Sequence, residues 1–292
     1  MSLTVNPAIL DLTTLARVKA WMAITNTSSD DVLQMAITTV SAQIMAYLER
    51  GSFIFREYKD FFDGQGNYLQ ATDRYPIIDV LQVVIDDQII PESPMNTPGN
   101  TQSSTPGWVV EVWDGLPPGH PQYIELIGYK FTRRRQNVFI DYTAGYYTRD
   151  EAQVVAPVPA SGTPTVGAFS IDQQYGINIA TDKLVYQDTK VPLVKTSDSP
   201  GVGQYAPDPS NPASFTVNVA DVGRTILTSY SWCPYAVEEI CWEMVNEAFS
   251  RRGRPGQHSR GLVGQETAQY DLSGMSNHAI DVLQAFRSII PL

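Results

Sequence analysis

The sequence predicts an α+β protein: a small bundle of about four helices with antiparallel β strands, plus an inserted all-β module. Three observations lead to this fold class. Apolar residues recur at three-or-four spacing near both ends of the chain, and they alternate with polar residues between residues 53 and 148. A strand-like pattern returns between 150 and 232, among stretches rich in Pro and Gly. We therefore expect residues 1–149 and 233–292 to form two parts of one core, interrupted by a β module at 150–232.

Two helices are expected before residue 52. The first carries an apolar stripe of Leu15, Val18 and Met22. The second has Asp30 and Asp31 in its first turn, where the helix dipole favours negative charge, and it ends near Arg50-Gly51. Its buried face is predicted to be Leu33, Ala36 or Ile37, Val40, Ile44 and Leu48.

The next hundred residues change to a period of two, which is typical of half-buried antiparallel strands. We expect Gly64-Gln65-Gly66 and Asp86-Asp87 to form turns between strands. Residues 91–107, with four prolines, are interpreted as a surface loop. The expected strands are Phe55–Asp63, Val80–Asp86, Trp108–Trp113, Tyr123–Ile127 and Asn137–Thr143.

The predicted module begins with a Pro/Ala/Ser/Gly-rich linker at 151–170 and contains a second loop at 201–212. Its expected strands are Gly176–Gln187, Val191–Lys195, Ser214–Val219 and Thr225–Trp232.

Helical spacing resumes at Pro234, a residue type suited to the first position of a helix. This third helix ends at Arg251-Arg252-Gly253, and its stripe of Ile240, Met244 and Val245 is expected to pack against the second helix. A last helix is capped by Ser276 or Asn277. Its predicted apolar side is Ile280, Leu283, Phe286 and Ile290.

Composition excludes several classes of function. The net charge of −11 is unsuited to holding nucleic acid by bulk attraction, and no run of about 18 apolar residues encodes a membrane span. The sequence contains no P-loop, G-x-S-x-G or paired-histidine motif, so we expect no enzyme activity, no metal site and no cofactor. Cys233 and Cys241 are interpreted as reduced core residues.

Two basic clusters are the candidate contact residues. Arg133, Arg134 and Arg135 precede a strand, while Arg251, Arg252, Arg254 and Arg260 gather around the end of the third helix. The first cluster could simply lie on a solvated loop, and the second could interact favourably with the dipole at the C-terminal end of the third helix. They could instead contact an acidic neighbouring subunit or DNA phosphates, and the negative net charge favours a protein neighbour.

The order of these parts resembles the tailed-phage head–tail connector (adaptor) family. The resemblance lies in Leu12–Trp21 (LTTLARVKAW), Tyr75–Val80 (YPIIDV), Val138–Tyr146 (VFIDYTAGY) and the two C-terminal helices, and it covers residues 10–149 and 233–291. Typical members lack the 150–232 block. The end of that block, Phe215–Tyr230, is similar to β modules of other phage virion proteins.

The resemblance implies a structural subunit of the virion neck, made and assembled in the host cytoplasm. It implies a homo-oligomeric ring, commonly of roughly twelve subunits, that binds the portal protein and the stopper or tail-completion proteins. Genomic DNA would pass through the ring without specific binding. The candidate portal or neighbour contacts are the seven arginines together with Phe286 and Ile290. The alternative is a virion protein that binds a carbohydrate or receptor through the Trp and Tyr residues of the β module.

Overall fold

The computed structural model divides the chain into two compact units. The first unit comprises residues 1–47 and 148–284, and the second comprises residues 48–147 and 285–292. The structure describes residues 10–96, 105–110, 122–158, 166–172, 177–197, 199–208, 211, 213–252, 259–260, 268–269 and 275–287.

The predicted fold class, a small helical bundle with a β module, is wrong. Strands hold 40% of the described residues and helices 25%, so the protein is mostly β. The error has a physical cause, because several strands lie in segments whose composition is typical of loops. The expected linker at 151–170 contains the end of β8 (Tyr147–Val154), β9 (Ala156–Pro157) and β10 (Val166–Ser170). Pairing with a neighbouring strand outweighs local propensity at such positions.

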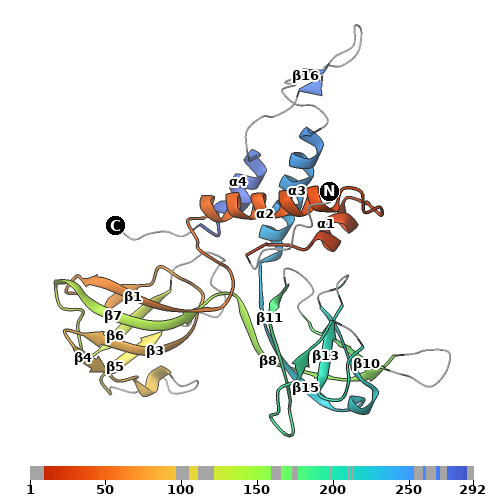
Figure 1. Ribbon diagram of the computed structural model, residues 1–292. Helices are drawn as coiled ribbons and strands as arrows, with labels where there is room; N and C mark the ends of the chain where they lie inside the picture. The colour runs from red at the N-terminus through yellow and green to blue at the C-terminus, as the bar shows by residue number, and fades with distance from the viewer. Residues whose placement is uncertain are drawn as a thin grey trace. The chain divides into compact units, whose positions relative to one another are not determined.

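The second unit consists of two antiparallel sheets (Figure 1). In one, β7 lies between β1 and β3, and β4 pairs with the free side of β3. Its strands are β1 (Arg56–Gly64), β7 (Arg134–Ala144), β3 (Ile77–Ile85) and β4 (Gln88–Ile90). In the other sheet, β6 lies between β2 and β5. Its strands are β2 (Leu69–Ala71), β6 (Tyr123–Ile127) and β5 (Gly107–Val110), and the short helix η1 (Pro94–Asn96) precedes β5.

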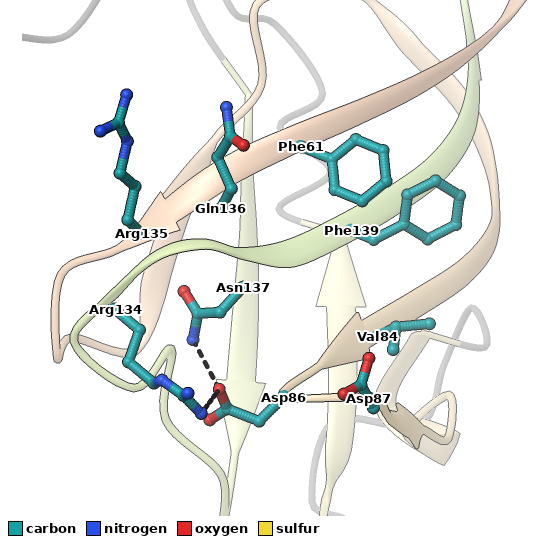
Figure 2. A pocket seen from close by; sticks show the side chains of 9 residues that line it. All are labelled: Phe61, Val84, Asp86, Asp87, Arg134, Arg135, Gln136, Asn137 and Phe139. Carbon is teal, nitrogen blue, oxygen red and sulfur yellow. Dashed lines mark hydrogen bonds and ion pairs between the residues drawn. The ribbon is translucent and has the colours of Figure 1, made fainter.

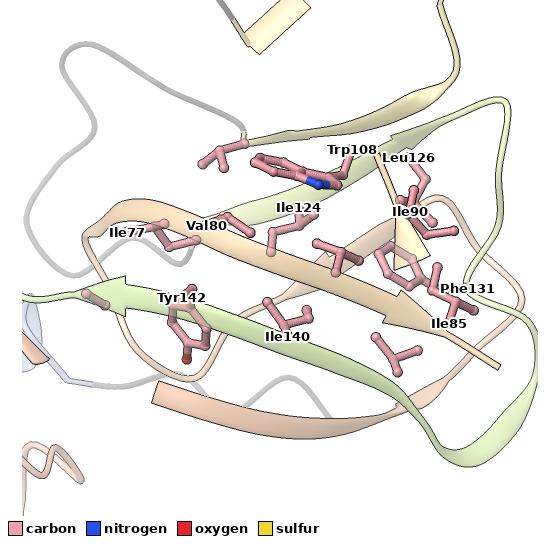
Figure 3. Close-up of a cluster of buried hydrophobic side chains, with 14 residues drawn as sticks. Ile77, Val80, Ile85, Ile90, Trp108, Ile124, Leu126, Phe131, Ile140 and Tyr142 are labelled. Atoms are coloured by element: carbon pink, nitrogen blue, oxygen red, sulfur yellow. The ribbon is translucent and has the colours of Figure 1, made fainter. Parts of the chain in front are cut away.

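The core of the second unit lies on one face of the β1-β7-β3-β4 sheet. Side chains on alternate residues of a strand point to opposite faces, and burial alternates in this way over residues 138–142 of β7 and 83–85 of β3. Figure 3 shows these side chains together with those of β4, β5 and β6. Val83, Ile124, Phe131, Val138 and Ile140 are all fully buried.

The predicted turns are confirmed. Asp86 and Asp87 join β3 to β4 with φ angles of 48° and 65°, the left-handed values of a two-residue hairpin turn. Gly66, with φ of 85°, lies in the turn between β1 and β2.

The strands of the first unit also form two sheets. One has the order β12-β13-β14-β10-β9, and the other has the order β11-β15-β8. Strand β13 lies in the stretch expected to be a Pro/Gly loop, which corrects that prediction. The strands not yet bounded are β11 (Ile177–Tyr186), β12 (Val194–Lys195), β13 (Gln204–Pro207), β14 (Ser214–Asn218) and β15 (Thr225–Trp232), with η2 (Val219–Asp221) between the last two.

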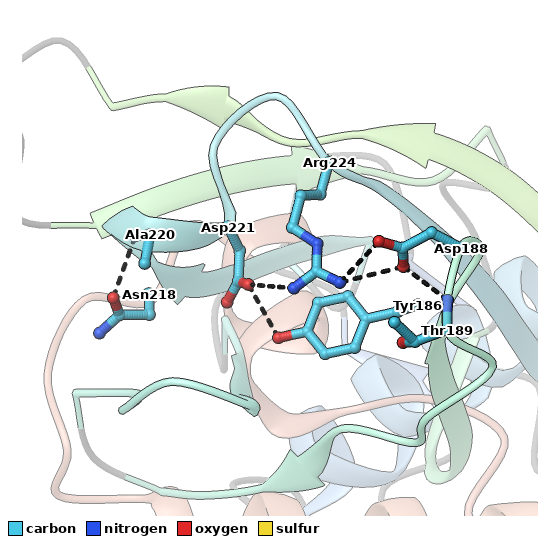
Figure 4. Close-up of polar contacts among 7 residues, drawn as sticks. All are labelled: Tyr186, Asp188, Thr189, Asn218, Ala220, Asp221 and Arg224. Atoms are coloured by element: carbon cyan, nitrogen blue, oxygen red, sulfur yellow. Dashed lines mark hydrogen bonds and ion pairs between the residues drawn. The ribbon is translucent and has the colours of Figure 1, made fainter.

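A buried carboxylate joins three segments of these sheets (Figure 4). Asp221, on η2, is fully buried and accepts hydrogen bonds from the Tyr186 hydroxyl (2.8 Å) and the Arg224 guanidinium (3.3 Å). The same guanidinium pairs with Asp188 at 2.9 Å and lies 3.8 Å from the centre of the Tyr186 ring. Burial and the neighbouring Asp221 raise the pKa of Tyr186 to about 12, so this hydroxyl stays a hydrogen-bond donor at neutral pH.

The helices that the structure describes all begin in the first unit. They are α1 (Leu15–Trp21), α2 (Asp30–Tyr47), α3 (Tyr235–Arg251) and α4 (Asn277–Gln284). The predicted packing of α2 against α3 is confirmed, and α3 also packs against α1 and α4. Helix α4 is shorter than predicted, because it ends at Gln284, before Phe286. Between α3 and α4, β16 (Ser259–Arg260) pairs with β17 (Ala268–Gln269).

An ion pair joins the helices from the two ends of the chain. The Arg17 side chain contacts both carboxylate oxygens of Glu238, at 2.7 and 3.0 Å, across 221 residues of sequence. The Glu238 side chain is fully buried, and it also accepts a hydrogen bond from Thr13 (2.9 Å). The Trp242 indole N–H donates to Thr13 (2.7 Å), and the Arg17 guanidinium lies 5.2 Å from the Trp242 ring centre. The buried carboxylate is therefore matched by a positive charge and by hydrogen-bond donors inside the bundle.

Cys233 and Cys241 are buried and free, as predicted. Burial raises the pKa of the Cys241 thiol to about 12, which keeps it protonated and unreactive at neutral pH.

Ile37→Ala should lower the free energy of unfolding by about 2–5 kcal/mol, because Ile37 is fully buried between α2 and α3 and its loss leaves a cavity. Met35→Ala is the matched control on the same helix. Met35 is 54% exposed, so its change should stay within about 0.5 kcal/mol. Chemical denaturation of the full chain measures both values, and equal effects would contradict the predicted burial.

Glu238→Gln should destabilise the protein by about 3 kcal/mol, because Arg17 then keeps its charge without a counter-charge. Glu243→Gln, on the more exposed side of α3, should change the midpoint little. The midpoint temperatures of thermal unfolding distinguish the two variants. A Glu238→Gln protein that unfolds at the same temperature as the original would show that the ion pair contributes nothing to the fold.

Candidate functional site

A row of apolar side chains crosses the outer face of the β1-β7-β3-β4 sheet. Phe61 on β1 lies opposite Phe139 on β7, Phe139 lies opposite Val84 on β3, and Val84 lies opposite Ile89 on β4. Both neighbours of Phe139 on β7 and of Val84 on β3 are buried on the other face, as is Ile90 next to Ile89 on β4, so the row points away from the core. We call these four residues the apolar row.

The apolar row is open to solvent. Phe61 is 63% exposed and Ile89 is 67% exposed, and the rings of Phe61 and Phe139 lie 5.0 Å apart, tilted by 48°. Exposed apolar side chains that gather on one face mark surfaces where proteins bind one another.

Charged side chains bound the row on both sides. On one side, Lys59 pairs with Glu57 (2.8 Å) and Asp141 (3.5 Å) across β1 and β7. On the other side lies a hollow of about 250 Å³ between the row and the turns, and Figure 2 shows the side chains that line it. Its lining is Phe61, Val84, Asp86, Asp87, Arg134, Arg135, Gln136, Asn137 and Phe139.

Asp86 organises this hollow. Its carboxylate accepts hydrogen bonds from the Thr132 hydroxyl, from Arg134 (3.0 Å) and from the Asn137 amide (3.2 Å). The Thr132 hydrogen bond, the Asn137 amide and the Arg134 charge together hold the pKa of Asp86 below its ordinary value. The Asn137 amide oxygen accepts from the backbone N–H of Gly64 (3.0 Å), which ties the hollow to the end of β1.

The arginine run, Arg133–Arg135, lies at the start of β7, and all three residues are exposed. Arg134 reaches toward Asp86, whereas Arg135 extends away from that carboxylate (Figure 2). Within the described part of the chain, neither Arg133 nor Arg135 has an ion-pair partner. Two carboxylates lie close by: Asp87 lines the same hollow, and Asp63 accepts a hydrogen bond from the Gln136 backbone (2.6 Å). The run therefore belongs to a surface of mixed charge in which two guanidinium groups stay available.

The other candidate residues belong mainly to the first unit. Arg251 pairs with Glu247 one turn earlier on α3 (3.0 Å), and Arg252 lies 4.8 Å from the Phe249 ring centre. Both lie at the end of α3, where a cation also favours the helix dipole. Phe286, in the second unit, is only 5% exposed, so its ring is already covered. Arg254, Ile290 and the side chain of Arg260 lie outside the described residues.

The apolar row was not predicted from the sequence, although a signal for it exists. Phe61 and Phe62 are adjacent on β1 and therefore point to opposite faces. Val83 and Val84 repeat the pattern on β3. A strand that is apolar on both faces has either a covered outer face or an outer face that binds a partner.

Most of the described aromatic rings of the β module are buried. Phe169, Tyr186, Tyr205, Phe215 and Tyr230 are each 6% exposed or less and form part of one core cluster. Trp232 is partly buried against the same cluster.

Among the described residues, no three His, Cys, Asp or Glu side chains gather in a way that could hold a metal ion. Within the same residues, no helix is long and apolar enough to cross a membrane.

Comparison with known proteins found no matching family model and no match among curated proteins.

Thr132→Val should raise the pKa of Asp86 toward its ordinary value, because the Thr132 hydroxyl supplies the largest stabilisation of the carboxylate. Since the pKa of folded Asp86 is lowered, its contribution to stability is present above the ordinary pKa and is lost as pH falls through the lowered value. A carbon-detected NMR titration measures this pKa. A Thr189→Val protein, changed at a threonine of the first unit, is the control, and an unchanged Asp86 pKa in Thr132→Val would contradict the assignment.

Proposed function

We propose that this chain is a structural subunit of a tailed-phage neck, a head–tail connector that acts by assembly. It forms a ring beneath the portal protein and joins the DNA-filled head to stopper or tail-completion proteins. Genomic DNA passes through the ring without specific binding, which suits a chain with a net charge of −11.

The observation that carries this proposal is the packing of helices from the two ends of the chain. The segments that resemble the connector family at the N-terminus include α1 and the start of α2, and those at the C-terminus include α3 and α4. Helix α3 packs against each of the other three, and Arg17 and Glu238 pair inside this bundle. A connector core interrupted by an inserted β module at 150–232 requires such an arrangement.

The apolar row supplies a second, independent argument for an assembly role. Aromatic side chains and arginines are enriched among the residues that contribute most to protein–protein binding. Here Phe61 and Phe139 lie beside Arg134 and Arg135 around one hollow. Such a rigid sheet face can present the same contact surface on every copy of a ring.

Negative-stain electron microscopy of the purified full chain, alone and mixed with the portal protein of the same phage genome, tests the proposal. We expect ring-shaped particles and added density on one end of the portal. The portal alone, and the portal mixed with serum albumin, are the controls. A chain that stays monomeric and leaves the portal unchanged would overturn the proposed function.

A further inference from the structure

We propose that the apolar row and the arginine run dock a second copy of this chain, and that they contact the α3 surface of that copy. This inference rests on the proposed function, because it names the contact between neighbouring subunits of the ring.

A flat face of this kind suits a folded partner better than a small molecule. The row extends across four strands, from Phe61 to Ile89, and the hollow beside it is half open. A folded partner can cover the row together with the arginines beside it, whereas a small ligand is held in an enclosed pocket.

The chain itself carries a surface of complementary charge on α3. Glu239, Glu243 and Glu247 follow one another at four-residue spacing, which places them on one line along the helix. We call these residues the glutamate stripe. All three are partly exposed, and Glu239 and Glu243 have no ion-pair partner among the described residues. Like charges at this spacing repel one another, so a cationic neighbour would stabilise the stripe.

The spacing of the two charged surfaces matches. Glutamates four residues apart on a helix are separated by about 6 Å along its axis, at a rise of about 1.5 Å per residue. Arg135 lies in β7 and Arg133 in the bend just before it, and positions two residues apart on extended backbone are separated by about 6.6 Å. Two guanidinium groups can therefore face two carboxylates without distortion of either element.

Aromatic side chains beside the glutamate stripe supply the apolar half of the contact. Tyr235, one turn before Glu239, is 43% exposed, and Trp21 is 44% exposed. Both rings pack on Trp242, at 6.0 Å and 6.4 Å between centroids. Both surfaces therefore place apolar side chains beside charged ones. Among the described residues, the unpaired charges of the glutamate stripe are negative and those of the arginine run are positive.

A contact between two different surfaces is heterologous, so each copy binds one neighbour through its sheet face and another through α3. Repetition of such a contact closes into a ring when the rotation between copies allows it. The inference therefore accounts for ring formation with surfaces that every copy carries.

Charge reversal on each surface tests the contact in the full chain. We expect Arg133→Glu with Arg135→Glu to raise the concentration needed for half-assembly by about tenfold or more, measured by mass photometry with and without the portal protein. Arg56→Glu with Arg149→Glu is the matched control, because both arginines are exposed, lie outside the row and give the same net charge. Glu239→Lys with Glu243→Lys should cause the same loss from the other side.

Mixing the two defective proteins gives the most specific result. At one type of contact in the mixture, glutamates in place of Arg133 and Arg135 face lysines in place of Glu239 and Glu243. At the other type, an unchanged arginine run faces an unchanged glutamate stripe. We expect the equimolar mixture to assemble when neither protein does so alone. Failure of the mixture, with both proteins folded by circular dichroism, would overturn the α3 assignment.

The apolar row is tested by Phe61→Ser with Ile89→Ser, against Leu69→Ser, an exposed leucine on the other sheet. Loss of rings only in the double variant is the expected result. If the double variant forms normal rings that no longer bind the portal, the sheet face docks the portal. If its rings and its portal binding are both normal, the sheet face has no role in assembly. Both outcomes overturn this inference and leave the proposed function standing, whereas a wild-type chain that is monomeric under all conditions overturns both.

Discussion

The fold depends on one buried ion pair, between Arg17 on α1 and Glu238 on α3. A fully buried carboxylate is costly unless a charge and hydrogen bonds satisfy it, and here Arg17 and Thr13 do so. These partners come from residues that precede Glu238 by more than two hundred positions, so α3 can bury this face only when the N-terminal segment is in place. The apolar stripes of α2 and α3 supply most of the burial. The ion pair fixes which helix faces meet, because sliding or rotating either helix would leave a buried charge without its partner.

That constraint explains how a helical core accommodates so much β structure. The chain leaves α2, forms the second unit, and returns to the first unit through β8 and the other strands before α3 begins. Each strand region has its own buried cluster, so neither needs the helices for its hydrophobic core. The Asp221 network in the β module follows the same rule as Glu238, since a buried carboxylate gathers donors from separate segments. Surface changes on either strand region can therefore leave the bundle intact.

Local signals predicted the helices and the tight turns, because caps, glycines and three-or-four spacing act within a few residues. The stripe from Leu33 to Ile44 and the Asp86-Asp87 turn are examples. Strands such as β9, β10 and β13 were missed because their stability comes from partners distant in sequence, and their Pro, Gly and Ala content is typical of loops. The arginine run could be identified as a candidate site from its charge alone. Its role could not be predicted from the sequence, which does not show that Arg134 forms an ion pair with Asp86 while Arg135 does not. Nor does the sequence show that Phe61 and Phe139 lie beside these arginines.

The exposed apolar row favours nonspecific association between copies, and the net negative charge of the chain opposes it. Copies with Phe61 and Ile89 on the surface would tend to associate nonspecifically, but each carries a net charge of −11, and like charges hold them apart at a distance. At physiological ionic strength this repulsion fades beyond about 8 Å, whereas charges in direct contact are screened less. Association then requires that opposite charges meet at short range, as guanidinium groups facing carboxylates do. The repulsion between the net charges and the pairing of opposite charges in contact together favour an arrangement in which the apolar row is covered and guanidinium groups face carboxylates.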